Sequence, residues 1–412
     1  MASTINAKTT GTGGIEYTGD ASGNVAIQSD GTTVLNTTAS GVEVTGTLQN
    51  NNVQVATQNV LGVRNLIING DMRIAQRGTS QTGLVSGNNF LIDRWLFNLD
   101  TTGTWTYEQD TTDVPTGQGF VSSLKLSCTT ANASITGTKW MNLQHRFEAQ
   151  FLQHLKWGTA SAESLTLTFW VKSNKTGTYT LSIYKSEGTA YGISKEYTID
   201  TADTWEKKTI SIDAHTIDVI ANDNGDGMRI YWVLDSGPDR KSSTLQTSWG
   251  VYDSTAFISP SQATLADSTS NYLNITGVQL EVGDTATPFE HRPYDVELAR
   301  CQRYYEKSYA VTTAPAGSDY YIQQVNPLNR GGGTGAVGYP IYYKVTKRAN
   351  PTVTPYTYDG TSGQWHTGVI GSSEAKGNAT IEDAGTNFFK VVVLYSTAPN
   401  AIYGHWVSSS EL

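Results

Sequence analysis

Aromatic side chains are the groups in this sequence that are best suited to binding a ligand. Six of them fall in two predicted loop regions: Trp249, Tyr252, Tyr356, Tyr358, Trp365 and His366. Tyr and Trp present a flat apolar face and a polar edge, which suits stacking on a sugar ring or packing on a receptor. For each ring taken singly, packing in a core or an interface is the alternative. Because loops on a rigid scaffold commonly carry function, we predict binding by the distal group, Tyr356 to His366.

Three further aromatic residues are candidates for the same chemistry. Trp170 and Tyr184 are expected to point outward from one pair of strands, and Trp406 lies in the distal region. We expect any binding to be reversible, through stacking and hydrogen bonds, and to be strengthened when several copies act together.

One short segment resembles the first half of a calcium loop. It runs Asn-Asp-Asn-Gly-Asp-Gly, and its candidate metal ligands are Asn222, Asn224 and Asp226. The position that would hold the bidentate Glu is Val233, inside a predicted strand. A tight turn between two strands explains the same residues. We therefore expect no cofactor, with a structural calcium at this turn as the alternative.

No motif in the sequence indicates catalysis. The six histidines show no zinc-binding spacing, and no serine lies in a GxSxG motif. Gly333–Gly338 matches GxGxxG, but no predicted strand precedes it and no helix follows. Asp93 and Arg94 are interpreted as a structural salt bridge, and His291 as a structural polar contact. We predict that the chain is not an enzyme and has no catalytic residues.

The elements that must position these groups are predicted to be strands. Charged residues make up only 16% of the chain, which contains 22 Tyr and 10 Trp. Thr, Tyr, Trp and Val favour strands, while Gly and Asn favour turns, so the composition predicts an all-β fold. The net charge of −9 argues against a nucleic-acid partner. No apolar run reaches the length of a membrane span, and Cys128 and Cys301 are expected to be reduced thiols.

Residues 64–294 are predicted to form a jelly roll, a β-sandwich. Leu165–Lys172 and Thr178–Tyr184 alternate apolar and polar side chains, which indicates strands with one buried face. The loop Ser173–Gly177 is predicted to join them as a hairpin. In Asn271–Val282 the apolar positions change from odd to even at Thr276-Gly277, which predicts a β-bulge.

Residues 295–412 are predicted to contain a linking helix and a smaller distal β domain. Leu298, Cys301 and Tyr305 share a helical face, so we place the helix at Asp295–Lys307. A shorter helical pattern covers Glu148–Lys156. The clearest distal strands are Ile341–Val345, Phe388–Tyr395 and Ile402–Val407.

Residues 1–63 differ from the rest of the chain, with one aromatic residue, Tyr17, and short β runs separated by turn dipeptides. Each run is too short and too weakly apolar to build a core by itself. Disorder is one interpretation. We favour an N-terminal intertwined β stem, in which identical copies bury these apolar positions together: Val25, Ile27, Val34, Leu35, Val42, Val44 and Leu48.

Two sequence blocks carry a resemblance to a known family. Asn65–Gly78 (Asn-Leu-Ile-Ile-Asn-Gly-Asp-Met-Arg-Ile-Ala-Gln-Arg-Gly), followed by Ile92–Phe97, resembles the opening of a β-sandwich domain that recurs in bacteriophage tail and fibre proteins. Gly277–Tyr294, followed by Glu297–Tyr305, resembles the way that this carbohydrate-binding-like domain closes. The resemblance implies a virion adhesin or structural fibre, and fibres of this kind are commonly trimers.

We therefore expect a structural virion protein, with a tail fibre that attaches to a host-surface glycan or receptor as the leading hypothesis. Its stem would bind other virion proteins. A head fibre or capsid decoration protein is the alternative, and a polysaccharide-degrading tailspike is a further one, although the sequence lacks the repeat of a long β-helix. The N-terminus does not resemble a signal peptide, so we expect synthesis in the bacterial host cytoplasm and release by lysis.

Overall fold

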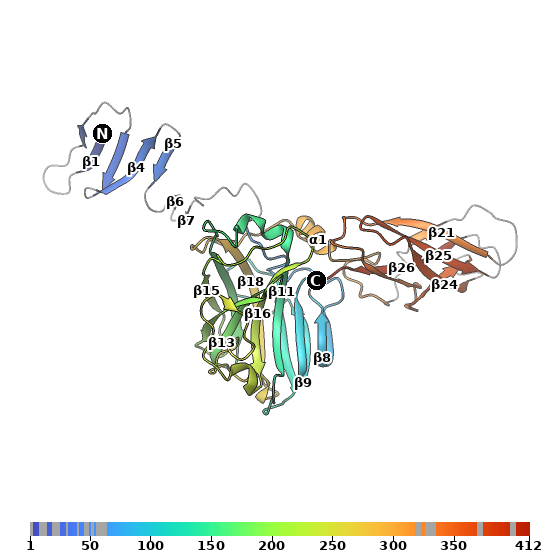
Figure 1. Cartoon of the computed structure of the whole chain (residues 1–412). Coiled ribbons are helices and arrows are strands. Elements are labelled where there is room, and N and C mark those ends of the chain that lie inside the picture. The colour runs from blue at the N-terminus through green and yellow to red at the C-terminus, as the bar shows by residue number, and fades with distance from the viewer. Residues whose placement is uncertain are drawn as a thin grey trace. The chain divides into compact units, whose positions relative to one another are not determined.

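The chain is all-β, as its composition predicts, and is described from a computed structural model (Figure 1). The structure describes residues 3–7, 15–18, 25–29, 32–38, 41–44, 49–50, 53–54, 64–317, 323–325, 335–368, 374–395 and 401–412. Contacts divide the chain into two units, Met1–Arg64 and Asn65–Leu412. None of the helices in these residues is long and apolar enough to cross a membrane.

The N-terminal unit contains a five-stranded sheet in the order β2-β1-β3-β4-β5 and a separate two-stranded pair. The strands are β1 (Ser3–Ala7), β2 (Ile15–Thr18), β3 (Val25–Ser29), β4 (Thr32–Thr38), β5 (Gly41–Val44), β6 (Gln49–Asn50) and β7 (Val53–Gln54). The side chain of Ile27 is 41% exposed. Of the apolar positions predicted to meet in an intertwined stem, only Ile27 and Leu35 have described side chains, so the intertwining of copies stays a prediction.

Residues 65–294 fold as a β-sandwich. Its strands are β8 (Ser80–Phe90), β9 (Leu96–Asp110), β10 (Ser123–Thr130), β11 (Trp140–Glu148), β12 (Leu165–Ser173), β13 (Gly177–Lys185), β14 (Tyr191–Ile199), β15 (Glu206–Ile212), β16 (Asp226–Ser236), β17 (Gly250–Val251) and β18 (Tyr272–Val282). Hydrogen bonds join them in one continuous sheet, in the order β15-β12-β18-β10-β9-β11-β16-β13-β14-β17, with β8 paired to β9. This sheet folds over into two layers, called the two sheets below: β15-β12-β18-β10 and β11-β16-β13-β14-β17. The long strand β9 joins the two, because its first residues pair with β11 and its last residues pair with β10.

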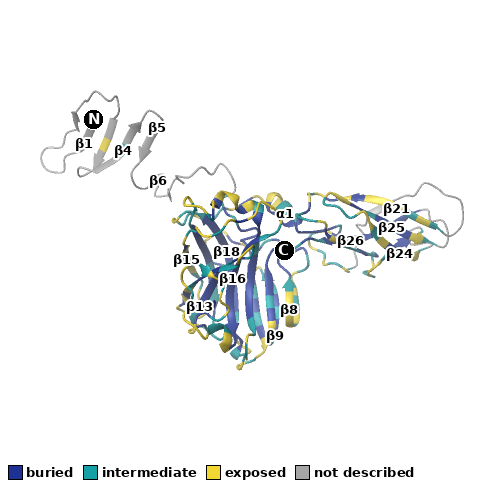
Figure 2. Ribbon diagram, in the orientation of Figure 1, coloured by how far each residue is buried: buried dark blue, intermediate teal, exposed yellow. Residues whose placement is uncertain are grey.

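The predicted inward side chains are buried, but the alternation is not strict, since the polar positions Thr166, Thr168, Thr180 and Ser182 are buried as well. Leu165, Leu167, Phe169 and Val171 of β12 are fully buried, as are Tyr179, Leu181 and Ile183 of β13. The Phe169 ring lies 5.9 Å from the Trp232 ring of the opposite sheet, centroid to centroid. Figure 2 shows buried residues along the strands of both sheets. The core is therefore filled from both layers, as sheet packing requires.

Gly277 forms the predicted bulge in β18. Thr168 pairs with Gln279 and Trp170 with Thr276, so β18 carries one extra residue at this point. Gly277 has a φ of +60°, and a Cβ there would lie 2.5 Å from the Phe120 ring. The predicted hairpin at Ser173–Gly177 is wrong. β12 pairs with β15 and β18, whereas β13 pairs with β14 and β16, so this loop crosses from one sheet to the other.

The helices are shorter than predicted. The segment predicted to be helical at Glu148–Lys156 forms the 3-10 helix η1 (Ala149–Leu155). Two further short 3-10 helices are η2 (Pro238–Lys241) and η3 (Leu265–Asp267). The linking helix α1 spans Tyr294–Gln302. The last predicted helical residues instead form strand β19 (Tyr305–Lys307), which pairs with the last strand of the chain.

The C-terminal residues form a smaller sheet around one central strand, β26 (Ile402–Ser409). The others are β19, β20 (Gln323–Val325), β21 (Gly335–Tyr342), β22 (Thr352–Tyr356), β23 (Gln364–Thr367), β24 (Ala375–Glu382) and β25 (Phe388–Tyr395). β26 pairs with β19, β20, β22 and β23. Phe389, Val391, Trp365 and Trp406 belong to its core.

Charged groups connect this sheet to the jelly roll within the second unit. Glu411 forms ion pairs with Arg77, at 2.9 Å, and with Arg94. Arg303 pairs with the fully buried Glu148 at 2.7 Å. Asp93 and Arg94 therefore do not pair with each other as predicted, since Asp93 bonds to Gln76 and Arg77 instead.

Candidate functional site

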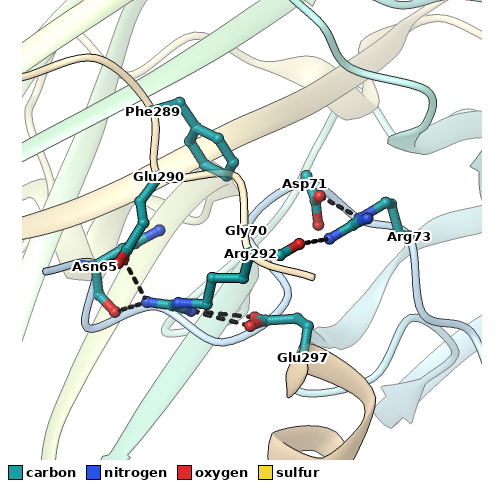
Figure 3. Close-up of a pocket in the computed structure, with 8 residues that line it drawn as sticks. All are labelled: Asn65, Gly70, Asp71, Arg73, Phe289, Glu290, Arg292 and Glu297. Carbon is teal, nitrogen blue, oxygen red and sulfur yellow. Dashed lines mark hydrogen bonds and ion pairs between the residues drawn. The ribbon is translucent and has the colours of Figure 1, made fainter. Parts of the chain in front are cut away.

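A small hollow lies where the opening and closing blocks of the jelly roll meet (Figure 3). Arg292 points into it and donates to the carbonyl of Ile67 at 3.0 Å and to the carboxylates of Glu297, at 3.1 Å, and Glu290, at 3.0 Å. Asn65 donates from its side chain to the carbonyl of Val278. These polar groups are directed at the protein itself. We therefore interpret the hollow as the closure of the sandwich, which explains why the two blocks are such distinctive sequence features.

The distal aromatic group does not form an exposed cluster. Trp365 lies on strand β23, is fully buried and donates its ring N–H to the carbonyl of His405 at 2.9 Å. Our prediction that Trp365 offers its ring to a ligand is therefore wrong, because its neighbours in the sheet cover it. Trp406 is also in the core, at 4% exposure. The Gly- and Thr-rich segment is thus not one loop, since it contains a strand with an inward ring.

His366 lies in a stack of rings. It is 3% exposed, and its ring centroid lies 4.4 Å from that of Tyr358 and 5.3 Å from that of Tyr403, which are 6.3 Å from each other. The Tyr358 hydroxyl donates to Glu374 at 2.9 Å. Tyr356 and Tyr358 are half-buried, and Tyr356 contacts the ring of Tyr309. Burial has the largest effect on the pKa of His366 and lowers it. The negative charge of Asp359 raises the pKa by less, so the neutral imidazole is favoured.

Trp249 and Tyr252 belong to different clusters of the jelly roll. Trp249 packs on the buried ring of His215, at 4.6 Å, and on Trp157, and it donates to the carbonyl of Asp213. Tyr252 instead lies edge-on to Tyr184, at 5.1 Å, and contacts Phe257. The structure therefore joins Tyr252 to Tyr184, which are far apart in sequence.

The predicted calcium turn is held by protein contacts. The Asp226 carboxylate pairs with Arg229, and the Asn224 side chain donates to the carbonyl of Arg348 at 2.7 Å. The described residues hold no group of three or more His, Cys, Asp or Glu side chains that could bind a metal. A calcium ion here would have to compete with the Arg229 guanidinium for Asp226.

Four aromatic residues gather on the outward face of strands β11, β16 and β13. Trp140 lies 5.2 Å from Tyr231, Tyr231 lies 6.5 Å from Tyr184, and Tyr184 lies edge-on to Tyr252. Tyr231 is 5% exposed, whereas Trp140, Tyr184 and Tyr252 are only half-buried. The strand alternation places these rings outward, because Met228, Ile230 and Trp232 of β16 point into the core.

A row of amide side chains continues this face across strands β8, β9 and β11. Asn98 donates to Asn88 at 2.8 Å, Asn142 donates to Asn98 at 3.3 Å, and Gln144 donates to Asn142 at 2.7 Å. Arg146 in turn donates to Gln144 at 3.1 and 3.2 Å. Each amide in the row is oriented by its neighbour, so its donors and acceptors are held in fixed directions. Asn142 and Gln144 are themselves buried, so Asn98 is the amide of the row, within β9 and β11, that reaches the surface.

Two arginines border the rings. Arg240 lies 4.4 Å above the Trp140 ring, and Arg229 lies 5.6 Å above the Tyr184 ring. Such cation–π contacts hold a ring in place without covering both of its faces. We call this surface the aromatic–amide face: Trp140, Tyr184, Tyr231, Tyr252, Asn98, Asn142, Gln144, Arg146, Arg229 and Arg240.

Sequence reasoning missed most of this face. It identified Tyr184 and Tyr252 but placed them in separate groups. The signal that could have found the rest lies in β11, where Trp140, Asn142, Gln144 and Arg146 occupy alternate positions between apolar residues. Trp170, the partner proposed for Tyr184, is on the other sheet, opposite Thr276. His291 is exposed and contacts the Phe289 ring, so its contacts are aromatic and not polar as predicted.

No family model matches the chain, and no curated protein matches it. Among solved structures it is similar to the enzymatically active domain of tailspike protein 4 from bacteriophage CBA120, with 17% identity and a TM-score of 0.29; the match covers 53% of this chain and 21% of that one. The chain is also similar to the C-terminal family 22 carbohydrate-binding module of a Clostridium thermocellum protein, with 11% identity and a TM-score of 0.26. This match covers 51% of this chain and 96% of that one.

A third similar structure is the family 11 carbohydrate-binding module from Clostridium thermocellum, solved with a β-1,3-1,4-mixed-linked tetrasaccharide. Its identity is 8%, the match covers 52% of this chain and 99% of that one, and the TM-score is 0.25. The match to the tailspike structure, by contrast, spans only about a fifth of that chain's length. Similarity at this level carries no conclusion about function, so we infer function from the side chains of this chain.

Proposed function

We propose that the chain is a non-enzymatic, glycan-binding protein of a phage virion fibre, and that it binds through the aromatic–amide face. The observation that carries the proposal is the combination of half-buried rings with a fixed row of amides on one sheet face. A sugar ring has two kinds of surface, C–H faces and hydroxyl edges. Tyr184, Tyr252 and Trp140 would contact the first by stacking, and Asn98, the part-exposed amide of the row, would hydrogen-bond the second.

The arrangement favours binding over reaction. The buried amides of Asn142 and Gln144 hold the part-exposed Asn98 in place, so a ligand would meet a group that needs little reordering, which lowers the cost of binding. Asp226, the carboxylate that contacts Arg229, is engaged by that cation. A glycosidase would need two carboxyl groups facing a common sugar. We therefore propose recognition and no hydrolysis at this face.

The experiment is a binding screen against an array of purified bacterial surface polysaccharides. The full chain is compared with three matched variants, Tyr184→Ala, Tyr358→Ala and Tyr342→Ala. Tyr342 is 72% exposed on the distal sheet and serves as the control. We expect roughly tenfold weaker binding for Tyr184→Ala, corresponding to about 1.4 kcal/mol, and no change for the other two. Loss of binding in Tyr358→Ala alone would move the site to the distal sheet.

The fibre part of the proposal rests on the resemblance of Asn65–Gly78 and Gly277–Tyr294 to phage fibre domains. Antibodies against the chain should label intact virions at a tail fibre, and label at the head would favour the decoration-protein alternative.

Light scattering should give about three times 44.6 kDa for a trimer. A persistent monomer with a folded stem would contradict the intertwined stem.

A further inference from the structure

Two arginines stand directly opposite each other on the aromatic–amide face. Arg146 of β11 pairs in register with Arg229 of β16, and Arg229 pairs in register with Tyr184 of β13. Like charges at directly opposed positions of neighbouring strands are destabilising. The opposed arginines on this part-exposed face therefore lower the stability of the sheet, and the fold does not require them.

The charges near this pair do not balance it. Asp226 is the one side-chain carboxylate, among the residues that the structure describes, that forms an ion pair with any of Arg146, Arg229 and Arg240. Arg146 donates to Gln144 and, at 2.6 Å, to a main-chain oxygen of Leu412, whose terminal group is a carboxylate in this chain, and Arg240 lies over Trp140. Three cations and two carboxylates thus lie on one face of a chain whose net charge is −9.

Both guanidiniums retain unused donors. A guanidinium has five N–H groups in a planar fork. Arg229 uses its Nε toward Asp226 and one Nη1 hydrogen toward the Tyr231 hydroxyl at 3.3 Å. Burial, followed by the charge of Arg229, lowers the pKa of Arg146, which agrees with a cation held close to another cation. An anionic group between the two forks would accept from both of them.

We propose that the glycan recognised by the aromatic–amide face is anionic, with a carboxylate or phosphate group bound between Arg146 and Arg229 while the adjoining sugar stacks on Tyr184. This inference rests on the glycan-binding function proposed above. Arg fits planar, bidentate contacts with both of these anions, and the aromatic row begins at the same strand position. A neutral glycan would leave the unused donors of both guanidiniums without an anionic acceptor.

The test uses an array that holds neutral, carboxylate-bearing and phosphate-bearing bacterial polysaccharides, with the carboxylate-bearing members also present in carboxyl-reduced form. The full chain is compared with Arg229→Gln, Arg229→Lys and Tyr184→Ala. Lys207→Gln is the charge-matched control, because Lys207 is exposed on β15 of the other sheet. Melting temperatures establish that each variant is folded.

We expect the full chain to bind anionic members at least tenfold more tightly than neutral ones. This binding should weaken between about 50 and 500 mM NaCl, because the screening length falls from roughly 10 Å at 0.1 M salt to roughly 3 Å at 1 M. Arg229→Gln should lose the preference, Arg229→Lys should retain part of it, and Lys207→Gln should keep all of it. Sensitivity to carboxyl reduction identifies a carboxylate as the anion, and binding of the phosphate-bearing members alone identifies a phosphate.

Equal binding of neutral and anionic glycans that still depends on Tyr184 would overturn the anionic ligand and leave the glycan-binding function standing. Binding that Tyr184→Ala does not weaken would overturn both. If a folded Arg229→Gln variant keeps the full preference for anionic over neutral glycans, the anion binds elsewhere.

Discussion

A ring that stacks on a ligand needs one face held by the protein and the other face open. Tyr184 is held by Tyr252, edge-on at 5.1 Å, and by Arg229 over its ring, while its side chain stays half-buried and so reaches the solvent. Trp365 does not, because Tyr343, Phe389 and Trp406 share its core and its N–H is bonded to His405. Residue type alone does not separate the two cases.

Trp365 should accordingly act on stability and not on binding. We expect Trp365→Ala to cost about 3–5 kcal/mol, the usual range for truncating a fully buried large aromatic side chain. Tyr358→Ala, in a half-buried stack, should cost less. Urea unfolding followed by circular dichroism measures both. A Trp365→Ala variant with unchanged stability and weaker glycan binding would restore the distal site.

At the scale of elements, the bulge in β18 lies where the side chains of Phe120 and Trp170 pack closely against the strand. Gly277 has positive φ and no side chain where Phe120 and Trp170 approach it. We expect Gly277→Ala to lower the free energy of unfolding by about 1–3 kcal/mol more than Gly83→Ala does. Gly83 has a similar positive φ of +71°, but a Cβ added there would meet no atom within 4 Å, so backbone strain largely cancels in the comparison. Equal losses in the two variants would contradict the packing at the bulge.

Strand periodicity predicted the sandwich because each buried face repeats every second residue along one strand. Leu165 to Val171, Tyr179 to Ile183 and the bulge at Gly277 are all correct for this reason. Strand partners are not predictable in this way, since pairing depends on residues distant in sequence, and the hairpin expected at Ser173–Gly177 is wrong on that account. The aromatic–amide face was missed on the same ground, because its members come from strands β9, β11, β13 and β16 and from the segments that hold Arg240 and Tyr252.

For the molecule as a whole, buried charges fasten the C-terminal residues to the jelly roll. Glu411 is buried between Arg77 and Arg94, whose guanidiniums lie over the rings of Tyr305 and Tyr304 at 3.6 and 3.5 Å. Burial raises the pKa of Glu411, but the charges of Arg94 and Arg77 together outweigh it and hold the pKa below its ordinary value. Removing one partner of a buried pair leaves the others uncompensated.

We expect Glu411→Gln to cost about 3–5 kcal/mol at pH 7. Glu163→Gln, which breaks the exposed pair with Lys156, should cost less than about 1 kcal/mol. Because the folded pKa of Glu411 is depressed, its contribution is present above the unfolded pKa of 4.5 and is lost as the pH falls through the folded pKa. Urea unfolding at a series of pH values should show a smaller acid loss in Glu411→Gln, and parallel profiles would contradict this role.

The most direct test of the proposed function is hydroxyl-radical footprinting of the aromatic side chains with and without a bound polysaccharide from the array. Glycan binding at the aromatic–amide face predicts reduced oxidation of Trp140, Tyr184 and Tyr252, with Tyr342 and Tyr358 unchanged. Protection confined to Tyr356 and Tyr358, or oxidation of Tyr184 that is the same in the free and bound protein, would contradict it.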